Sequence, residues 1–436
     1  MRVRIRPSKA HGHMEAPPSK SMAHRLLICA GLAEGESVIS NVDLSRDILT
    51  TLGCLQALGA DVSCEKEKKR VTVRGIDIRS RTRAAELDCG ECASTLRFMI
   101  PVCLTSGNKS TLTGSRTLFQ RPLSVYEDIC REQKLTYEKR ENRLTVAGSL
   151  AAGEYVVPGN ISSQFISGLL FILPLLEKDS TIRLIPPVES RPYIDMTILA
   201  LREFGVTVVA EVPALSMPSA GTVPHGLQDK SRGSCSFREN FILRIPGGQR
   251  YSPRTDLRVE GDYSNAAFFE ALNLLGSEVE IDGLDENSLQ ADKIFRSYFE
   301  KLRKGYAEAD LSDCPDLGPV LMVLAAALHG GRFTGTRRLK IKESDRGTAM
   351  RQELEKMGVR MELSENEICI EPGIKPPGEV LDGHNDHRIV MALSVLLTRT
   401  GGTIRGAQAV SKSLPDFFER LKKLGIEADC DESDTA

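Results

Sequence analysis

The chain has 436 residues, of which 41% are hydrophobic and 27% are charged, and its formal net charge is -2. This composition is typical of a globular protein, and no apolar stretch reaches the roughly 18 residues that a membrane span requires. The charge balance gives no general attraction to nucleic acid or to anionic lipid, so binding of an anion must depend on a local basic cluster.

The N-terminus and the cysteines indicate a cytoplasmic protein. The opening residues, Met-Arg-Val-Arg-Ile-Arg-Pro, alternate as a strand does and lack the apolar core of a signal peptide. Eleven cysteines are scattered between Cys29 and Cys430, an odd number that favours reduced thiols over a disulfide framework. Because the length exceeds that at which one core keeps growing, we expect two domains.

The first helix is predicted to open within residues 17–25, before the apolar run Leu26 to Leu32. Lys20 and Ser21 stand at its start and Arg25 follows one turn later, so one phosphate or carboxylate could meet all three. The glycines of a Walker loop are missing. For this segment alone, a solvated helix cap is an equal alternative.

A C-x-x-C motif, Cys89 to Cys92, invites a zinc or redox interpretation. The chain has no second cysteine pair at ligand spacing, so we disfavour that interpretation. The small residues that lead to Arg97 favour a turn whose backbone amides approach an anion.

Three later segments offer polar side chains at predicted helix starts. Arg121-Pro122 is basic, and proline suits a first helical turn. Ser162-Ser163-Gln164 precedes an apolar helix predicted over 165–176, and Ser190 and Tyr193 add a hydroxyl and a phenol. Each segment alone is compatible with a helix cap, but together they suit a polyhydroxy or phosphate ligand.

The last third of the chain carries the charged motifs. Asp316 precedes an apolar helix predicted over 320–328, where an N-cap is the simple alternative. The run 338–346 is strongly basic, and apolar helical periodicity begins only at Met350, so the charges are predicted to precede a helix and to suit an anion. Arg388 lies in a further basic tripeptide, and Lys412 is predicted at another helix start.

Two patterns recur along the chain. Helices that end in a glycine turn are predicted before Gly59, Gly205, Gly358 and Gly425. Polar-alternating strands are predicted to begin at Ser37, Ser110, Ser180, Ser277, Gly331 and Gly402, which gives about six units of a βαβ type, three per domain. The segment 212–238, rich in Pro, Ser and Gly, is predicted to be a mobile insertion, with the domain crossover after it.

Taken in order, these motifs closely resemble the 5-enolpyruvylshikimate-3-phosphate synthase family of enolpyruvyl transferases over essentially the whole chain. The motifs that carry the resemblance are Lys20-Ser21 with Arg25, Arg97, Arg121-Pro122, Ser162-Ser163-Gln164, Ser190 with Tyr193, Pro315-Asp316, Lys342-Glu343 with Arg346, Asp386-His387-Arg388, and Lys412 with Pro415-Asp416.

The resemblance implies an α/β fold, a two-domain inside-out α/β barrel with six repeats and an active site between the domains. It implies one domain of residues 1–18 plus 258–436 on the phosphoenolpyruvate side and another of 19–257 on the shikimate 3-phosphate side. It also implies transfer of the carboxyvinyl group of phosphoenolpyruvate to the 5-hydroxyl of shikimate 3-phosphate, through a tetrahedral intermediate and without a metal or organic cofactor. We expect a cytoplasmic monomer of the shikimate pathway whose two domains close on these substrates.

The family's residue roles carry over by motif. The residues implied for shikimate 3-phosphate are Lys20, Ser21, Arg25, Ser162, Ser163, Gln164, Ser190, Tyr193, Asp316 and Lys342. The residues implied for phosphoenolpyruvate are Lys20, Ala93, Arg121, Gln164, Arg346, Arg388 and Lys412. The resemblance implies that Asp316, Glu343 and Lys20 are catalytic, with the two acids as the acid/base pair; the sequence does not decide which of them moves which proton.

Three positions depart from the common pattern of the family. Ala93 replaces a glycine and adds a methyl group where phosphoenolpyruvate and the inhibitor glyphosate bind, so we expect reduced glyphosate sensitivity. Glu91 replaces a neutral amide, and Arg338 replaces an asparagine that often contacts the shikimate phosphate.

Two alternatives compete with this interpretation. The related transferase that acts on UDP-N-acetylglucosamine usually carries a loop cysteine, and the corresponding stretch, 113–121, has none. A non-catalytic anion-binding relative is the other alternative, although both Asp316 and Glu343 are retained.

Overall fold

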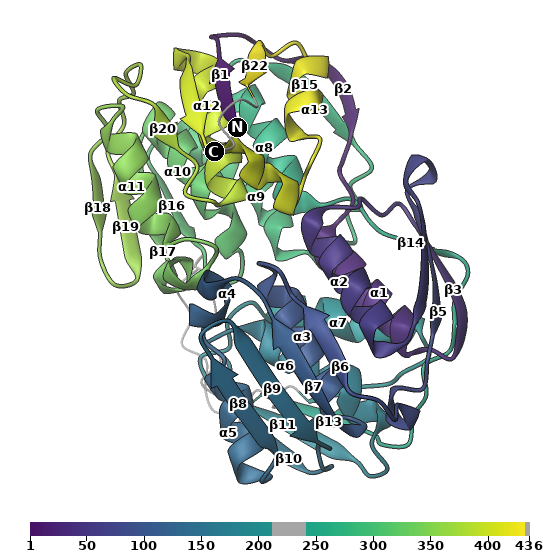
Figure 1. Ribbon diagram of the computed structural model, residues 1–436. Coiled ribbons are helices and arrows are strands. Elements are labelled where there is room, and N and C mark those ends of the chain that lie inside the picture. The colour runs from purple at the N-terminus through teal and green to yellow at the C-terminus, as the bar shows by residue number, and fades with distance from the viewer. Residues whose placement is uncertain (212–240, 432–436) are drawn as a thin grey trace, which may run out of the picture.

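The computed structural model describes residues 1–211 and 241–431, which form two stacked halves of sheets and helices (Figure 1). The predicted insertion at 212–238 lies outside these described residues. Within the described ranges, no helix has both the length and the apolar character needed to cross a membrane.

Five of the six sheets in the described chain repeat one four-stranded pattern, and the sixth has two strands. In the order given, the first two strands of each sheet are parallel and the later neighbours are antiparallel. The sheets of the lower half are β14 (Leu257–Arg258), β3 (Gly35–Ser40), β5 (Arg70–Gly75) and β4 (Asp61–Glu65); β6 (Ala85–Asp88), β7 (Gly107–Thr113), β9 (Arg143–Gly148) and β8 (Thr136–Arg140); and β10 (Glu154–Pro158), β11 (Ser180–Ile185), β13 (Phe241–Ile245) and β12 (Val209–Glu211). Those of the upper half are β16 (Ala307–Asp310), β17 (Gly331–Thr334), β19 (Glu367–Ile370) and β18 (Met361–Leu363); β20 (Leu381–Asp382), β21 (Gly402–Arg405), β1 (Arg2–Ile5) and β22 (Ala428–Asp431); and β15 (Glu278–Asp282) with β2 (His11–Glu15). The predicted six repeats are confirmed, and the sixth is reduced to its parallel pair.

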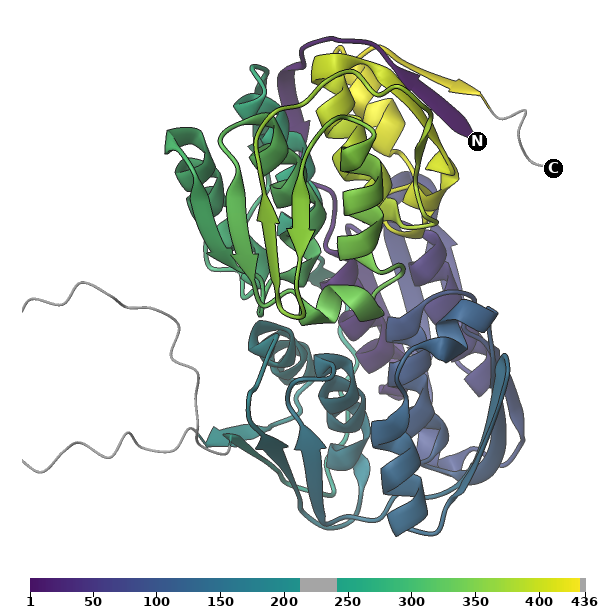
Figure 2. The same ribbon diagram turned by 90° about the vertical axis from the view of Figure 1, so that its left-hand side faces the viewer.

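The helices pack on the inner faces of these sheets (Figure 2). They are α1 (Lys20–Leu32), α2 (Arg46–Leu58), α3 (Ala93–Cys103), α4 (Arg116–Gln120), α5 (Ser124–Glu132), α6 (Ser163–Ile172) and α7 (Arg191–Glu203) in the lower half, and α8 (Tyr263–Leu274), α9 (Phe295–Lys304), α10 (Gly318–Ala327), α11 (Arg346–Glu355), α12 (His387–Thr400) and α13 (Phe417–Lys423) in the upper half. Several of them, α3, α6, α10 and α12, are buried on nearly every face, as helices that are apolar all round must be. Helices therefore lie inside and sheets outside, as an inside-out barrel requires.

Two separate hydrophobic cores follow from this arrangement. The N-terminal core contains buried side chains from Met22 to Val259, and the C-terminal core contains those from Val3 to Ala10 together with those from Tyr263 to Ala428. Strand β1 joins the second core because it pairs with β21 and β22, of which β22 is labelled beside it in Figure 1. The chain thus starts in the upper half, then forms the lower half, and finally forms the rest of the upper half.

Most local predictions are confirmed. Backbone φ is positive at Gly59 (114°), Gly205 (79°), Gly358 (78°) and Gly425 (93°), which ends each preceding helix as expected. Each of the six predicted strands lies within an observed strand or overlaps one. The charges of 338–346 do precede a helix, since α11 begins at Arg346.

Three helix predictions are wrong. Arg121 and Pro122 lie in the connection between α4 and α5, because α5 starts only at Ser124. The helix predicted to reach 176 ends at Ile172, and a 3-10 turn that contains Pro174 follows, since proline cannot donate the next helical hydrogen bond. Lys412 ends a 3-10 helix, Ala407–Lys412, and α13 starts at Phe417.

Candidate functional site

One cleft of about 950 Å³ gathers nearly all of the predicted site residues. It is lined from both halves of the molecule by Lys20, Ser21, Arg25, Ala93, Arg121, Ser162, Ser163, Gln164, Ser190, Tyr193, Asp316, Lys342, Glu343, Arg346 and Arg388. Lys412 lines a smaller hollow of about 250 Å³, which shares Arg121 and Glu343 with the cleft. We call the residues from α1, α3, α4, α6 and α7 and their flanking turns the N-side wall, and those between Asp316 and Arg388 the C-side wall.

The start of α1 supplies the first cations of the N-side wall. Ser19 caps the helix by accepting a hydrogen bond from the Met22 amide at 3.3 Å. One turn later, Arg25 donates to the Ser21 carbonyl at 2.6 Å and to Thr197 Oγ1 at 2.8 Å. It forms no ion pair with a described carboxylate, and burial lowers the pKa of its guanidinium.

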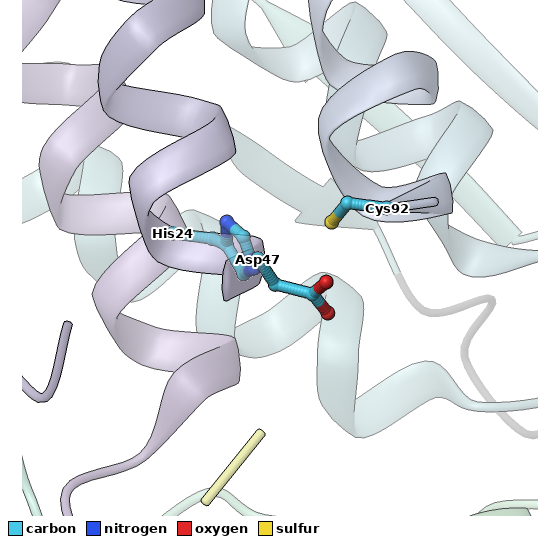
Figure 3. Close-up of side chains that lie close together, drawn as sticks. All are labelled: His24, Asp47 and Cys92. Atoms are coloured by element: carbon cyan, nitrogen blue, oxygen red, sulfur yellow. The ribbon is translucent and has the colours of Figure 1, made fainter. Parts of the chain in front are cut away.

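Three side chains, His24, Asp47 and Cys92, lie close together and come from α1, α2 and the turn before α3 (Figure 3). Their ligand-type atoms lie within 4.8 Å of one another, a spacing that also suits a metal ion. The Asp47 carboxylate, however, already pairs with the Lys20 ammonium at 2.8 Å. Burial raises the pKa of Cys92 to about 12 and lowers that of His24, so both are neutral beside this ion pair. Of the three side chains, Asp47 is therefore the one committed to Lys20.

Close packing of α3 against α6 aims a second cation at the cleft. A side chain on Gly168 of α6 would meet the Arg97 carbonyl oxygen at 2.8 Å, so only glycine permits this approach. Arg97 Nη1 then donates to Gln164 Oε1 at 2.7 Å, and Gln164 Nε2 donates to Ser94 Oγ at 2.8 Å. Arg97 Nε has no partner in the described chain, and burial lowers the pKa of this guanidinium.

Hydroxyl groups at the starts of α6 and α7 complete the N-side wall. Ser162 caps α6 by accepting from the Gln164 amide at 3.3 Å. Ser190 occupies the N-cap position of α7 with a left-handed backbone, φ 56°, and instead of capping the helix its hydroxyl accepts from Arg338 Nη1 at 2.5 Å. Tyr193 donates to Asp292 Oδ2 at 2.9 Å. Arg338 and Asp292 belong to the other half, so these hydroxyl groups also join the two halves.

The C-side wall is an ion-pair network centred on Arg346, of which 1% of the side chain is exposed. Arg346 donates to Asp316 Oδ1 at 2.8 Å, to Glu343 Oε2 at 2.7 Å and to Asp386 Oδ2 at 2.8 Å. Asp316 also lies 3.2 Å from Lys342 Nζ and 3.3 Å from Arg388 Nη2. It does not cap α10, whose N-cap position is Leu317, so the capping alternative fails.

This network sets the charges of the two candidate catalytic acids. Burial alone raises the pKa of Asp316 and of Glu343, but the surrounding cations hold both well below their ordinary values. Both acids are therefore ionised without ligand. Burial lowers the pKa of Lys342 to about 8, so this ammonium gives up its proton more readily than an ordinary lysine.

Sequence reasoning gave no role to three acids that hold this site together. Asp47 pairs with Lys20, Asp386 pairs with Arg346, and Asp292 accepts from Tyr193. Asp47 lies in the first turn of α2 and Asp386 is the N-cap of α12, where an acid is expected simply to stabilise a helix. The positions of Asp47 and Asp386 at helix starts are shared with ordinary caps, so the sequence carries no signal that distinguishes them.

The chain is similar to known proteins both in sequence and in fold. A family model described as EPSP synthase (3-phosphoshikimate 1-carboxyvinyltransferase) matches residues 5–221 and 238–421. A 3-phosphoshikimate 1-carboxyvinyltransferase of Clostridium perfringens is 40% identical over 97% of this chain and 98% of the relative. EPSP synthase from Acinetobacter baumannii superimposes with a TM-score of 0.73 at 22% identity, over 98% of this chain and 100% of that one. The enolpyruvyl transferase NikO from Streptomyces tendae gives a TM-score of 0.71 at 14% identity, over 98% of both chains.

Proposed function

Because this chain belongs to the EPSP synthase family and is a 3-phosphoshikimate 1-carboxyvinyltransferase, we propose that its cleft holds shikimate 3-phosphate and phosphoenolpyruvate between the two walls. The enzyme is a transferase of the shikimate pathway of aromatic amino acid biosynthesis. The single observation that carries the assignment of the cleft is the Arg346 network, which brings two ionised carboxylates to the position where cations from both halves converge.

Shikimate 3-phosphate is assigned mainly to the N-side wall. Hydroxyl and amide groups suit its phosphate, and the residues proposed to hold this substrate are Lys20, Ser21, Arg25, Ser162, Ser163, Gln164, Ser190, Tyr193, Asp316 and Lys342. Arg25 supports the assignment because it is buried without a carboxylate partner among the described residues, and a substrate carboxylate would supply one. Asp316 and Lys342 reach the ring hydroxyls from the opposite wall.

Phosphoenolpyruvate is assigned to the cations between the walls. Its proposed contacts are Lys20, Ala93, Arg121, Gln164, Arg346, Arg388 and Lys412. Lys20, Arg121, Arg346 and Arg388 border one cleft, so they can surround a phosphate and a carboxylate at once. Lys412 is the exception, because it must be reached through the adjoining hollow.

The chemistry requires a base for the 5-hydroxyl and an acid for the enol methylene. We assign Asp316 to the hydroxyl proton, which it accepts as the oxygen adds to C2, while Glu343 protonates C3. Glu343 is ionised at rest, but phosphoenolpyruvate competes for Arg121 and Arg346, which raises the pKa of Glu343 so that it takes up a proton from solvent before the reaction. In the second step C3 returns its proton to Glu343, the C2–C3 double bond re-forms as the C2–O bond to the phosphate breaks, and phosphate leaves with the proton from Asp316. Lys20 stabilises the departing charge.

The two cores are proposed to be two domains, 1–18 plus 258–436 and 19–257, that close on the substrates. Support comes from polar contacts that cross between the two cores, such as Tyr193 to Asp292 and Arg338 to Ser190. A rotation of one half away from the other would break these contacts, and closure would form them. Solution scattering should report a shorter separation of the domains with shikimate 3-phosphate than without it. An unchanged profile would argue against closure.

A phosphate-release assay tests the assigned reaction directly. Shikimate 3-phosphate with phosphoenolpyruvate should release phosphate, and UDP-N-acetylglucosamine in its place should not. The reverse preference would reject the substrate assignment. We also propose that the enzyme works as a cytoplasmic monomer, which light scattering and cell fractionation can test.

A further inference from the structure

Glu91 and Lys412 form an ion pair between the two halves. Glu91 lies in the turn before α3 of the lower half, and its Oε2 lies 2.7 Å from Lys412 Nζ of the upper half. Asn385 Nδ2, also of the upper half, donates to Glu91 Oε1 at 3.1 Å. The carboxylate of Glu91 therefore occupies a cation at the edge of the phosphoenolpyruvate region.

The position of Lys412 does not depend on this carboxylate. Its ammonium also donates to the Asn385 carbonyl at 2.6 Å, and only 6% of its side chain is exposed. The Glu91 side chain is 36% exposed, so its carboxylate can turn into solvent and stay hydrated when another anion takes its place at the ammonium. Burial raises the pKa of Glu91, but Lys412 and Asn385 outweigh that effect and keep the pKa below its ordinary value, so Glu91 is an anion at neutral pH.

The hollow beside the cleft connects this pair to the reaction centre. Glu91, Asn385 and Lys412 line it together with Arg121 and Glu343, which also line the cleft. A trianionic substrate that reaches Lys412 through this hollow would meet the negative charge of Glu91 at the same cation. Two anions cannot share one ammonium without mutual repulsion.

We propose that Glu91 is an internal competitor for Lys412, which phosphoenolpyruvate must displace and which thereby sets the affinity for that substrate. This inference rests on the proposed role of Lys412 as a phosphoenolpyruvate ligand. It makes Glu91 an affinity-setting residue, since its carboxylate gives up the ammonium to the substrate and takes no part in the reaction itself.

Steady-state kinetics of a double-mutant cycle test the proposal. Glu91→Gln keeps the size of the side chain and removes its charge, so the KM for phosphoenolpyruvate should fall about 2- to 5-fold, the range expected for one partly exposed ion pair. The KM for shikimate 3-phosphate should stay within about twofold, which shows that the cleft is intact. Glu86→Gln removes the same charge from the exposed face of β6 and serves as the matched control.

Lys412→Met provides the second side of the cycle. It should raise the KM for phosphoenolpyruvate, and adding Glu91→Gln to it should cause no further fall, because the contested ammonium is gone. Two results would overturn the proposal that Glu91 competes for Lys412. One is a KM for phosphoenolpyruvate in Glu91→Gln that is unchanged or higher than in the wild type. The other is a fall in this KM on adding Glu91→Gln to Lys412→Met that equals the fall seen in the wild type. A Lys412→Met variant with the wild-type KM would instead show that the assignment of Lys412 as a ligand is wrong.

Discussion

The two walls of the cleft differ in how their most deeply buried arginines, Arg25 and Arg97 on one side and Arg346 on the other, are paired. On the N-side wall, Arg25 and Arg97 are buried among hydroxyls, carbonyls and an amide, and neither forms an ion pair with a described carboxylate. On the C-side wall, Arg346 is equally buried but pairs with three carboxylates. The same residue type is thus left without a counter-ion on one wall and fully neutralised on the other.

This difference in the pairing of buried arginines assigns ligand binding to one wall and proton transfer to the other. A buried cation without a counter-ion is costly until an anion arrives, so the N-side wall gains most from the substrate itself. The C-side wall is assembled before the substrate arrives, and its cations keep Asp316 and Glu343 ionised. One wall therefore attracts ligand charge, and the other holds groups that move protons.

The largest effect is expected from breaking the C-side wall at Glu343. Glu343→Gln keeps the shape and removes the proton carrier, so kcat should fall about 10³-fold while the KM for shikimate 3-phosphate changes little. Stopped-assay kinetics provide the measurement, with Glu365→Gln on an exposed loop as the control. A kcat within tenfold of the wild type would remove Glu343 from the mechanism.

Stability should respond oppositely on the two walls. Arg346→Met leaves Asp316, Glu343 and Asp386 without their shared cation and should lower the free energy of unfolding by about 3–5 kcal/mol. Arg97→Met removes a buried charge that has no carboxylate partner among the described residues, so stability should stay within about 1 kcal/mol or rise. Urea unfolding measures the free energy of unfolding of both variants. If the two variants lost equal amounts of this free energy, the proposed difference between the walls would be contradicted.

The N-side wall is also expected to discriminate between ligands through Ala93. Ala93→Gly removes a methyl group from the cleft, so glyphosate, which is longer than phosphoenolpyruvate, should inhibit about tenfold more strongly. Dose-response curves at fixed phosphoenolpyruvate give the measurement, and the KM for phosphoenolpyruvate serves as the internal reference. Equal, tight inhibition of both forms would refute the expectation.

The smallest effect concerns pH. Burial lowers the pKa of Lys342 to about 8, so this lysine is charged below that pH and neutral above it. The kcat/KM for shikimate 3-phosphate should therefore fall about fivefold between pH 8 and pH 9, following loss of the ammonium. In Lys342→Arg the fall should move to higher pH. A flat profile in the wild type would mean that the charge of Lys342 is not needed.

The sequence by itself determined the elements whose cause is local. Glycine turns, the alternating strands and the start of α1 at Lys20 are decided within a few residues, and they predicted the six repeats. The ordered site motifs, through their resemblance to a known family, predicted the family and the activity that the comparisons confirm. The prediction at Arg121 failed although Pro122 suits a helix start, because residues 121–123 form the connection between α4 and α5.

Only the tertiary structure decided which charges meet. Arg346 pairs with Asp386, which lies forty positions further along the chain, and Glu91 pairs with Lys412 of the opposite half. An acid at a helix start looks the same in the sequence whether it caps that helix or holds a distant cation, because both roles use the same oxygen atoms. Ion pairing of this kind depends on how two separately formed cores are brought together, which no local pattern records.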